Sequence, residues 1–369
     1  MESEYKQMAM PLHLHYDFLT SYVINDPDFF TKKVSFMKSA GVKTVWLDNY
    51  IYGEWQNSLE DCCRAKAMLE EEGFEVQAIC VPLGHGGINA LNGDGTDPSL
   101  PPSWQNRVNA DGKRLETAAC VDDVVIQNYR EAIRIHKELG FTKVFYDDDL
   151  RLGGWGPQLQ GCFCDRCIDR FYKKYPQFDG MSRADIVRLG VPGSDVRDAW
   201  ETIQCDSILR FLTETTPEGI TPGIMVMNNG DRRHGIDIPR IKEAFPNALF
   251  RVGESLFNDC GFTSPLGRAF LERSVRKHLS LIGSVEHAFS ETTTYPVGAL
   301  SPENFVEKIR WEIGCGLRNI YLMSGNVFLT PPYWEALTAA REELEALAEA
   351  TPLPVLDGTP LCEDFIWNI

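Results

Sequence analysis

The sequence predicts an α/β fold, a (β/α)8 TIM barrel with long insertions after its third and fourth strands. Over 369 residues, a unit of helix, glycine, apolar residue and short strand recurs. Eight strand candidates can be placed, each followed by a helix candidate. Alternating strands and helices require a parallel sheet covered by helices, and about 250 residues suffice for eight such units. A doubly wound open sheet is the alternative architecture.

The units can be followed in order along the chain. A first strand at 12–16 precedes a helix that begins at the cap Asp26 and ends at Gly41. Glycines also precede the next strands, because a glycine commonly ends a helix in the left-handed conformation. We expect the remaining strands at 43–48, 76–81, 144–146, 224–227, 249–252, 284–288 and 319–323.

Two long segments account for the length beyond a minimal barrel. Residues 84–121 follow the third strand and 151–197 follow the fourth, so both insertions belong to the face where such barrels build their sites. No low-complexity or Pro/Ser-rich linker interrupts the chain, which favours one domain over 1–350. Residues 351–369 contain three prolines and are predicted to pack on the barrel as a tail.

Composition limits the partners that the protein can have. Lys and Arg number 36 against 53 Asp and Glu, which gives a formal net charge of −17. An acidic surface repels phosphate backbones and anionic lipids, so we expect neither nucleic acid nor membrane as a partner. The start of the chain lacks the features of a signal peptide, and eleven cysteines, an odd number, argue against a disulfide framework. We therefore expect a cytoplasmic protein; a homo-oligomer is left open.

A cysteine cluster predicts a structural zinc site. Cys162, Cys164 and Cys167 lie within six residues, and thiols at this spacing can converge on one soft ion, whereas disulfides in such short loops would be strained. Cys120 is the expected fourth ligand, with water, Asp165 or Cys205 as alternatives. Such a site would link the two insertions. A set of four sulfur ligands leaves no open position, so the site should be structural.

The cluster resembles the zinc site of glycoside hydrolase family 42 β-galactosidases, where a cysteine-rich loop follows the fourth strand and one cysteine lies upstream. The resemblance covers 120–167 and the general barrel layout. It implies a barrel glycosidase with an acid/base carboxyl on the fourth strand and a nucleophilic carboxylate on the seventh. This chain departs from that family at the fourth strand, which ends in three aspartates (147–149) instead of Asn-Glu.

Carboxylates at the predicted strand ends supply the candidate catalytic residues. Glycoside hydrolysis needs one protonated and one ionised carboxyl group. Strand alternation favours Asp148 as acid/base, with Asp149 as the second choice, if the face of Val144 points into the barrel. Glu286 on the seventh strand is the expected partner, and Glu254 on the sixth is the alternative. The aspartates could instead cap a turn or neutralise nearby arginines.

Other polar and aromatic groups at the same face are expected to bind a carbohydrate, because sugars combine apolar C–H faces with hydroxyl groups. These residues are His15, Asp48, Tyr50, His85, Trp155, Asn228 and His287. The predicted function is hydrolysis of a small oligosaccharide or glycoside, or the reaction of a close relative. The alternatives are a metal-dependent sugar isomerase or epimerase, and a carbohydrate-binding barrel without activity.

Overall fold

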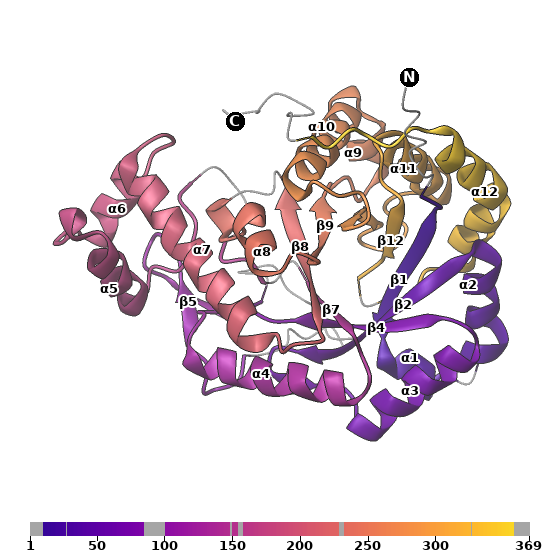
Figure 1. Cartoon of the computed structure of the whole chain (residues 1–369), viewed down its shortest axis with the longest axis horizontal. Coiled ribbons are helices and arrows are strands. Elements are labelled where there is room, and N and C mark those ends of the chain that lie inside the picture. Colours follow the sequence, from indigo (N-terminus) through magenta and orange to yellow (C-terminus); the bar gives the residue numbers. More distant parts are fainter. Residues whose placement is uncertain are drawn as a thin grey trace, which may run out of the picture. The chain divides into compact units, whose positions relative to one another are not determined.

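The computed structural model describes residues 10–26, 28–84, 100–147, 150–153, 158–228, 232–325 and 327–357 (Figure 1). The predicted barrel is confirmed: eight parallel strand positions form a closed sheet surrounded by helices. The sheet order is β1-β12-β10-β9-β8-β7-β4-β2, and β1 also pairs with β2, which closes it. The barrel strands are β1 (His13–Leu19), β2 (Val42–Ile51), β4 (Glu75–Val81), β7 (Lys143–Tyr146), β8 (Thr221–Asn228), β9 (Leu249–Gly253), β10 (Ala288–Phe289) and β12 (Asn319–Met323).

Two short strands accompany the barrel strands. The seventh position is divided between β10 and β11 (Thr292–Thr293), and both segments pair with β12 in one continuous register. β3 (Glu54–Trp55) pairs antiparallel with the end of β2. The seventh strand therefore continues beyond Phe289, which decides the side chains that it places at its carboxyl end.

The chain divides into two compact units, and each is described by itself. Unit 1 comprises Met1–Asp48, Asn57–Gln77 and Leu249–Glu363, and unit 2 comprises Asn49–Gln56, Ala78–Ala248 and Asp364–Ile369. No helix in the described part of the chain combines the length and the apolar composition that a bilayer span requires.

In unit 1, some of the helices begin at serine caps. Ser264 and Ser301 each accept a hydrogen bond from a backbone N–H of the first turn, and proline follows directly in both cases. Helix α12 packs against α2 and α11 (Figure 1). The helices are α1 (Thr20–Asn25), η1 (Phe29–Lys33), α2 (Val34–Ala40), α3 (Leu59–Glu71), α9 (Asp259–Thr263), α10 (Pro265–Ile282), α11 (Pro302–Gly314) and α12 (Pro331–Ala350).

In unit 2, the segments after β4 and β7 carry additional structure. A hairpin of β5 (Asn106–Val108) and β6 (Arg114–Ala119) precedes α4 (Asp123–Glu138). Helices α5 (Asp165–Lys174) and α6 (Arg183–Leu189) follow β7 and pack against α7 (Asp195–Thr215) (Figure 1). Their apolar core includes Phe163, Phe171 and Trp200. The shorter elements of the unit are η3 (Pro176–Phe178), η4 (Arg232–His234) and α8 (Ile238–Ala244).

The first residues after α12 lie against the chain that leads into β12. The Arg318 guanidinium donates a hydrogen bond to the Thr351 carbonyl at 2.5 Å. Pro354 lies so close to Gly316 that a Cβ at this glycine would be 2.6 Å from the proline ring. Residues 358–369 of the predicted tail lie outside the described part of the chain.

Candidate functional site

Four aromatic side chains show which face of the unit 1 strands points into the barrel. The ring of Phe289 on β10 is centred 4.8 Å from that of His15 on β1 and 6.4 Å from that of Trp46 on β2. Strands β10 and β2 are separated by β12 and β1 in the sheet, so these rings can meet only in the interior. Tyr321 on β12 joins them, with its ring 5.9 Å from Trp46.

The next interior layer, two residues toward the carboxyl ends, is ionic. Side chains alternate along a strand, so Asp17, Asp48 and Glu291 lie one layer beyond His15, Trp46 and Phe289 on the same interior face. All three are buried, as is Arg251, which pairs in register with Phe289. The ionic layer therefore contains three carboxyl groups with one guanidinium beside them. It lies at the end of the barrel where such folds place their sites.

Glu291 is held by one ion pair and two backbone hydrogen bonds. Its Oε1 lies 2.9 Å from Nη2 of Arg251, and its Oε2 accepts the backbone N–H groups of Glu254 at 2.6 Å and Ser255 at 2.7 Å. Burial raises the pKa of Glu291, whereas Arg251 and the nearby Lys308 oppose the rise. Since Oε1 is paired with a guanidinium and Oε2 accepts two backbone N–H groups, the geometry fits the ionised carboxylate.

The two backbone donors belong to a strained turn. Ser255 and Leu256 adopt left-handed conformations, with φ of 58° and 64°. Neither is glycine, so each costs on the order of 1 kcal/mol or more. The turn directs consecutive N–H groups at one carboxylate oxygen, an arrangement that binds anions. Strain of this kind persists where the surrounding structure enforces it, and it is concentrated at functional sites.

Asp17 differs from Glu291 in its surroundings. Burial raises its pKa to about 7, although Arg251 opposes the rise. Its Oδ1 has no hydrogen-bond partner among the described residues. Asp17 therefore titrates near neutral pH. Burial raises the pKa of both carboxyl groups, and the ion pair and the two backbone donors that favour the charged form are at Glu291.

A second buried ionic group adjoins the first. Glu254, Lys308 and Glu312 are all fully buried. The Lys308 ammonium lies 3.4 Å from Glu254 and 4.0 Å from Glu312. Glu312 also accepts a hydrogen bond from the Thr292 hydroxyl at 2.6 Å. Burial, and then the neighbouring Glu254, raise the pKa of Glu312 well above its usual range. One ammonium between two carboxyl groups favours a proton on one of them.

The expected placement of the seventh strand is wrong. Helix α10 ends at Ile282 with Gly283 as its C-cap, and the chain turns through 285–287 before β10 begins at Ala288. Asn319 donates to the carbonyls of Val285, Glu286 and Ala288 and stabilises this turn. Glu286 is consequently exposed at the amino end of the strand, and His287 is half-buried there. The carboxylate at the other end is Glu291.

The expected orientation of the fourth strand, β7, is also wrong. The Tyr146 hydroxyl lies 3.3 Å from that of Thr215 on α7, so the face shared by Val144 and Tyr146 points to the helices. Phe145 is packed over Gly223 of the neighbouring strand, and it shares the interior face with the half-buried Asp147. Asp148 and Asp149 themselves lie outside the described residues.

The other predicted site residues occupy different places. Asp48 is in the ionic layer, whereas His15 lies one layer deeper, within hydrogen-bonding distance of Trp46 and Asn319. Tyr50, in unit 2, is buried with its ring 5.1 Å from Tyr129. Glu254 points into the Lys308 cluster. His85, Trp155 and the side chain of Asn228 lie outside what the structure describes.

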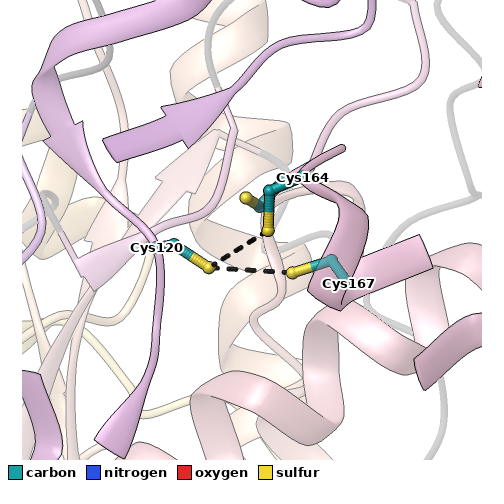
Figure 2. Close-up of side chains that lie close together, drawn as sticks. Cys120, Cys164 and Cys167 are labelled. Carbon is teal, nitrogen blue, oxygen red and sulfur yellow. Dashed lines mark hydrogen bonds between the residues drawn. The ribbon is translucent and has the colours of Figure 1, made fainter. Parts of the chain in front are cut away.

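The four predicted cysteines meet in unit 2. The Sγ atoms of Cys120, Cys162, Cys164 and Cys167 all lie within 4.8 Å of one another, and all four residues are buried. Figure 2 shows Cys120 directed at Cys164 and Cys167, with sulfur–sulfur distances of 3.8 and 3.7 Å. Hydrogen bonding from Cys120 and the other thiols holds the pKa of Cys164 far below its usual value, so the cluster stabilises a thiolate, the form that binds metal.

One cavity of about 430 Å³ lies on the outside of unit 2, between α5 and α7. It is lined by Arg170, Lys173, Lys174, Ile203, Asp206 and Arg210. Asp206 pairs with Lys174, and Arg210 pairs with Asp123 and Glu214. The cavity contains a single carboxylate, so it lacks the acid pair that the predicted chemistry requires.

Sequence reasoning missed the groups that organise the ionic layer. Glu291, Arg251, Lys308 and Glu312 were not among the predicted residues. One signal for Glu291 was present: it is followed by Thr292, Thr293 and Thr294, and a run of β-branched residues favours a strand more than the segment around Glu286 does. No comparable signal marks Lys308, which lies on a helix and reaches the site only through packing.

Solved structures with a similar fold include several glycoside hydrolases. The glycoside hydrolase domain of PgaB (BpsB) from Bordetella bronchiseptica is 11% identical, with a TM-score of 0.58 over 93% of this chain and 100% of that one. The catalytic domain of β-amylase from Paenibacillus polymyxa is 15% identical, with a TM-score of 0.60 and the same coverage.

The third neighbour is Gan42B, a family 42 β-galactosidase from G. stearothermophilus, at 13% identity and a TM-score of 0.59. The match covers 92% of this chain, which spans 57% of Gan42B. No protein-family model and no curated protein sequence matches the chain. The similarity is therefore one of fold: a TIM barrel of the kind found in glycoside hydrolases.

Proposed function

We propose that the protein is a glycoside hydrolase, or a close relative, that acts on a small oligosaccharide or glycoside through carboxyl groups in the barrel. The observation that carries this proposal is the geometry of Glu291, a buried carboxylate at the carboxyl end of the seventh strand that pairs with Arg251 and accepts two backbone N–H groups. The glycosidase fold of the structural neighbours supports the same reaction class.

In the proposed reaction, Glu291 acts on the anomeric carbon. It either attacks this carbon or stabilises the positive charge that develops there as the glycosidic bond breaks. A second carboxyl group protonates the leaving oxygen, and water completes the displacement. Arg251 and the two backbone N–H groups keep Glu291 ionised and fix its orientation before the substrate arrives, so little reorganisation remains for the transition state.

Two proposals exist for the acid. Asp17 is supported by its buried, unpartnered Oδ1 and by a pKa of about 7, which keep a proton available near neutral pH. Asp148, with Asp149 as the alternative, follows from the sequence and lies outside the described residues. Asp48, which shares the interior layer with Asp17, would hold a substrate hydroxyl group.

A panel of 4-nitrophenyl glycosides tests the proposal. Glu291→Gln should lower turnover by about 10²–10⁴-fold, and azide should restore part of the activity of Glu291→Gly if the carboxylate is a nucleophile. Glu286→Gln is the matched control, because Glu286 is exposed five residues upstream. A loss of activity in Glu286→Gln but not in Glu291→Gln would reverse the assignment. Asp17→Asn and Asp148→Asn distinguish the two acids.

The same experiment addresses the alternatives. Activity that appears only with added Mn²⁺ or Mg²⁺, on a free aldose, would indicate an isomerase or epimerase. Binding of an oligosaccharide without turnover, unchanged in Glu291→Gln, would indicate a carbohydrate-binding barrel.

We further propose that the four cysteines hold a structural zinc ion. Four buried sulfur atoms within 4.8 Å of one another match the donor set of closed zinc sites. Cys120 follows the β5–β6 hairpin, and Cys167 is on α5, so the ion would link two segments of unit 2. Bound zinc would supply cross-linking energy in place of the apolar burial that long loops lack.

A further inference from the structure

Lys308 occupies an unusual position for a lysine. It lies on α11, is fully buried, and combines two hydrogen bonds to main-chain carbonyls with an ion pair. It donates to the carbonyls of Ser255 at 2.9 Å and Glu291 at 2.6 Å, and it lies 3.4 Å from the Glu254 carboxylate. Burying an ammonium is costly unless it is paired. The two carbonyls and the Glu254 carboxylate offset this cost for Lys308.

The three contacts of Lys308 converge on the surroundings of one carboxylate. Ser255 supplies an N–H to Glu291 through the strained turn, and Lys308 binds the carbonyl of that same residue. Lys308 also binds the main-chain carbonyl of Glu291 itself. The ammonium thus fixes both the strand that carries the carboxylate and the left-handed turn that donates to it. Without it, two buried carbonyls would lose their donor, and the turn could relax.

We propose that Lys308 is a positioning residue for Glu291: it holds the Ser255–Leu256 turn and the seventh strand in the one arrangement in which the carboxylate receives its backbone donors. This role rests on the proposed function of Glu291. Glu254 and Glu312 provide the counter-charges that allow Lys308 to stay ionised in the interior, and Thr292 fixes Glu312 by a hydrogen bond.

The positioning role of Lys308 predicts a change in the pKa of Glu291 that a purely structural role does not. Lys308 lowers the pKa of Glu291 through its charge, against the effect of burial. Removing the ammonium should therefore raise the pKa of Glu291 in the folded protein, both through the lost charge and through relaxation of the turn. A lysine that acted on Glu291 only through its charge would raise this pKa when Lys308 alone is replaced. It would do so much less when Glu254, whose charge has the opposite effect on Glu291, is replaced with it.

The test uses Lys308→Met in the full chain, with Lys173→Met on the exposed face of α5 as the matched control. Because the single variant leaves Glu254 buried without its partner, Glu254→Gln/Lys308→Met is the second variant, which removes both charges together. The pKa of Glu291 is measured without substrate, by NMR of 13C-labelled glutamate side chains, with Glu291→Gln to assign the signal. Turnover is measured on whichever glycoside the wild-type protein hydrolyses.

We expect the pKa of Glu291 to rise in both Lys308 variants, and kcat to fall by about 10–10²-fold with a smaller change in KM. Lys173→Met should resemble wild type in both respects. An unchanged pKa of Glu291 in the folded Glu254→Gln/Lys308→Met variant would overturn the proposal. A raised pKa with unchanged kcat, or with no glycoside hydrolysed by the wild type, would retain the positioning role and remove the proposed function of Glu291.

Discussion

The Nη2 of Arg251 lies 2.9 Å from Oε1 of Glu291, and neither side chain is more than 7% exposed. The pair joins the sixth and seventh strands in the barrel interior, within one compact unit. A buried ion pair is weak evidence for stability, because desolvation offsets much of the attraction. The pair is therefore better explained by the role proposed for Glu291 than by a gain in stability.

Removing the guanidinium alone should be strongly destabilising. Arg251→Met would leave Glu291 buried without its counter-charge, at a cost of about 3–5 kcal/mol in the free energy of unfolding. Arg251→Met/Glu291→Gln, which removes both charges, should be clearly more stable than the single variant. Urea unfolding of the two variants and of Glu291→Gln completes a double-mutant cycle. Additive effects would show that the two side chains do not interact.

Asp17 should make stability fall as pH rises. Its pKa in the folded protein, about 7, is above the ordinary value of 3.8. The stabilisation that comes from the neutral carboxyl is therefore complete below the unfolded pKa and is lost as pH rises through 7. Asp17→Asn should remove this slope and gain on the order of 3 kcal/mol relative to wild type at pH 8. If the free energy of unfolding of the wild type and of Asp17→Asn changed in parallel between pH 4 and pH 8, the raised pKa of Asp17 would be contradicted.

His136 should produce the opposite dependence. It is fully buried on α4, where Nδ1 donates to the Ala132 carbonyl at 2.8 Å, and burial lowers its pKa to about 4. An unfolded histidine binds a proton near pH 6.5. The stabilisation that comes from the neutral, buried imidazole is therefore fully present above that pH and is lost as pH falls toward 4. His136→Gln should remove a decrease on the order of 3 kcal/mol, whereas His287→Gln, at a half-buried turn, should retain it.

The cysteine cluster predicts about one tightly bound zinc ion per chain. Metal analysis of the reduced, purified protein should detect this ion, and Cys162→Ser should abolish or greatly weaken its binding. Cys205→Ser is the control, since Cys205 is buried in the same unit but does not belong to the cluster. Removing the metal with a chelator should lower the Tm of the wild type and leave that of Cys162→Ser unchanged. Equal zinc content in both variants would contradict the ligand set.

The seventh strand shows where sequence reasoning reached its limit. The prediction placed Glu286 at the carboxyl end of a strand, because an apolar segment and a carboxylate occur together there. The structure begins the strand at Ala288 instead, because Asn319 stabilises a turn through three backbone carbonyls. That stabilisation comes from a neighbouring strand 31 to 34 residues away in sequence, so no local pattern could reveal it.

The predicted orientation of the fourth strand was wrong for a related reason. Alternation correctly divides Val144 and Tyr146 from Phe145 and Asp147, but it does not say which face is interior. Tyr146 is directed to α7 by its hydroxyl group, which lies within hydrogen-bonding distance of the Thr215 hydroxyl. Gly223 on the next strand leaves room for Phe145 on the other face. Both contacts are made by elements more than 60 residues further along the chain.

Short-range periodicity and the residues that end helices predict the number and order of the strand–helix units, and they favour the barrel over an open sheet. The cysteine spacing predicts the cluster at 162–167 and favours Cys120 over water, Asp165 or Cys205 as the fourth ligand, and the structure brings the four cysteines together. Only the tertiary structure decided which strand faces point inward and which acid meets Arg251. Those outcomes depend on where the closed sheet brings distant side chains together, and an ion pair such as Arg251–Glu291 exists only once burial has removed both groups from water.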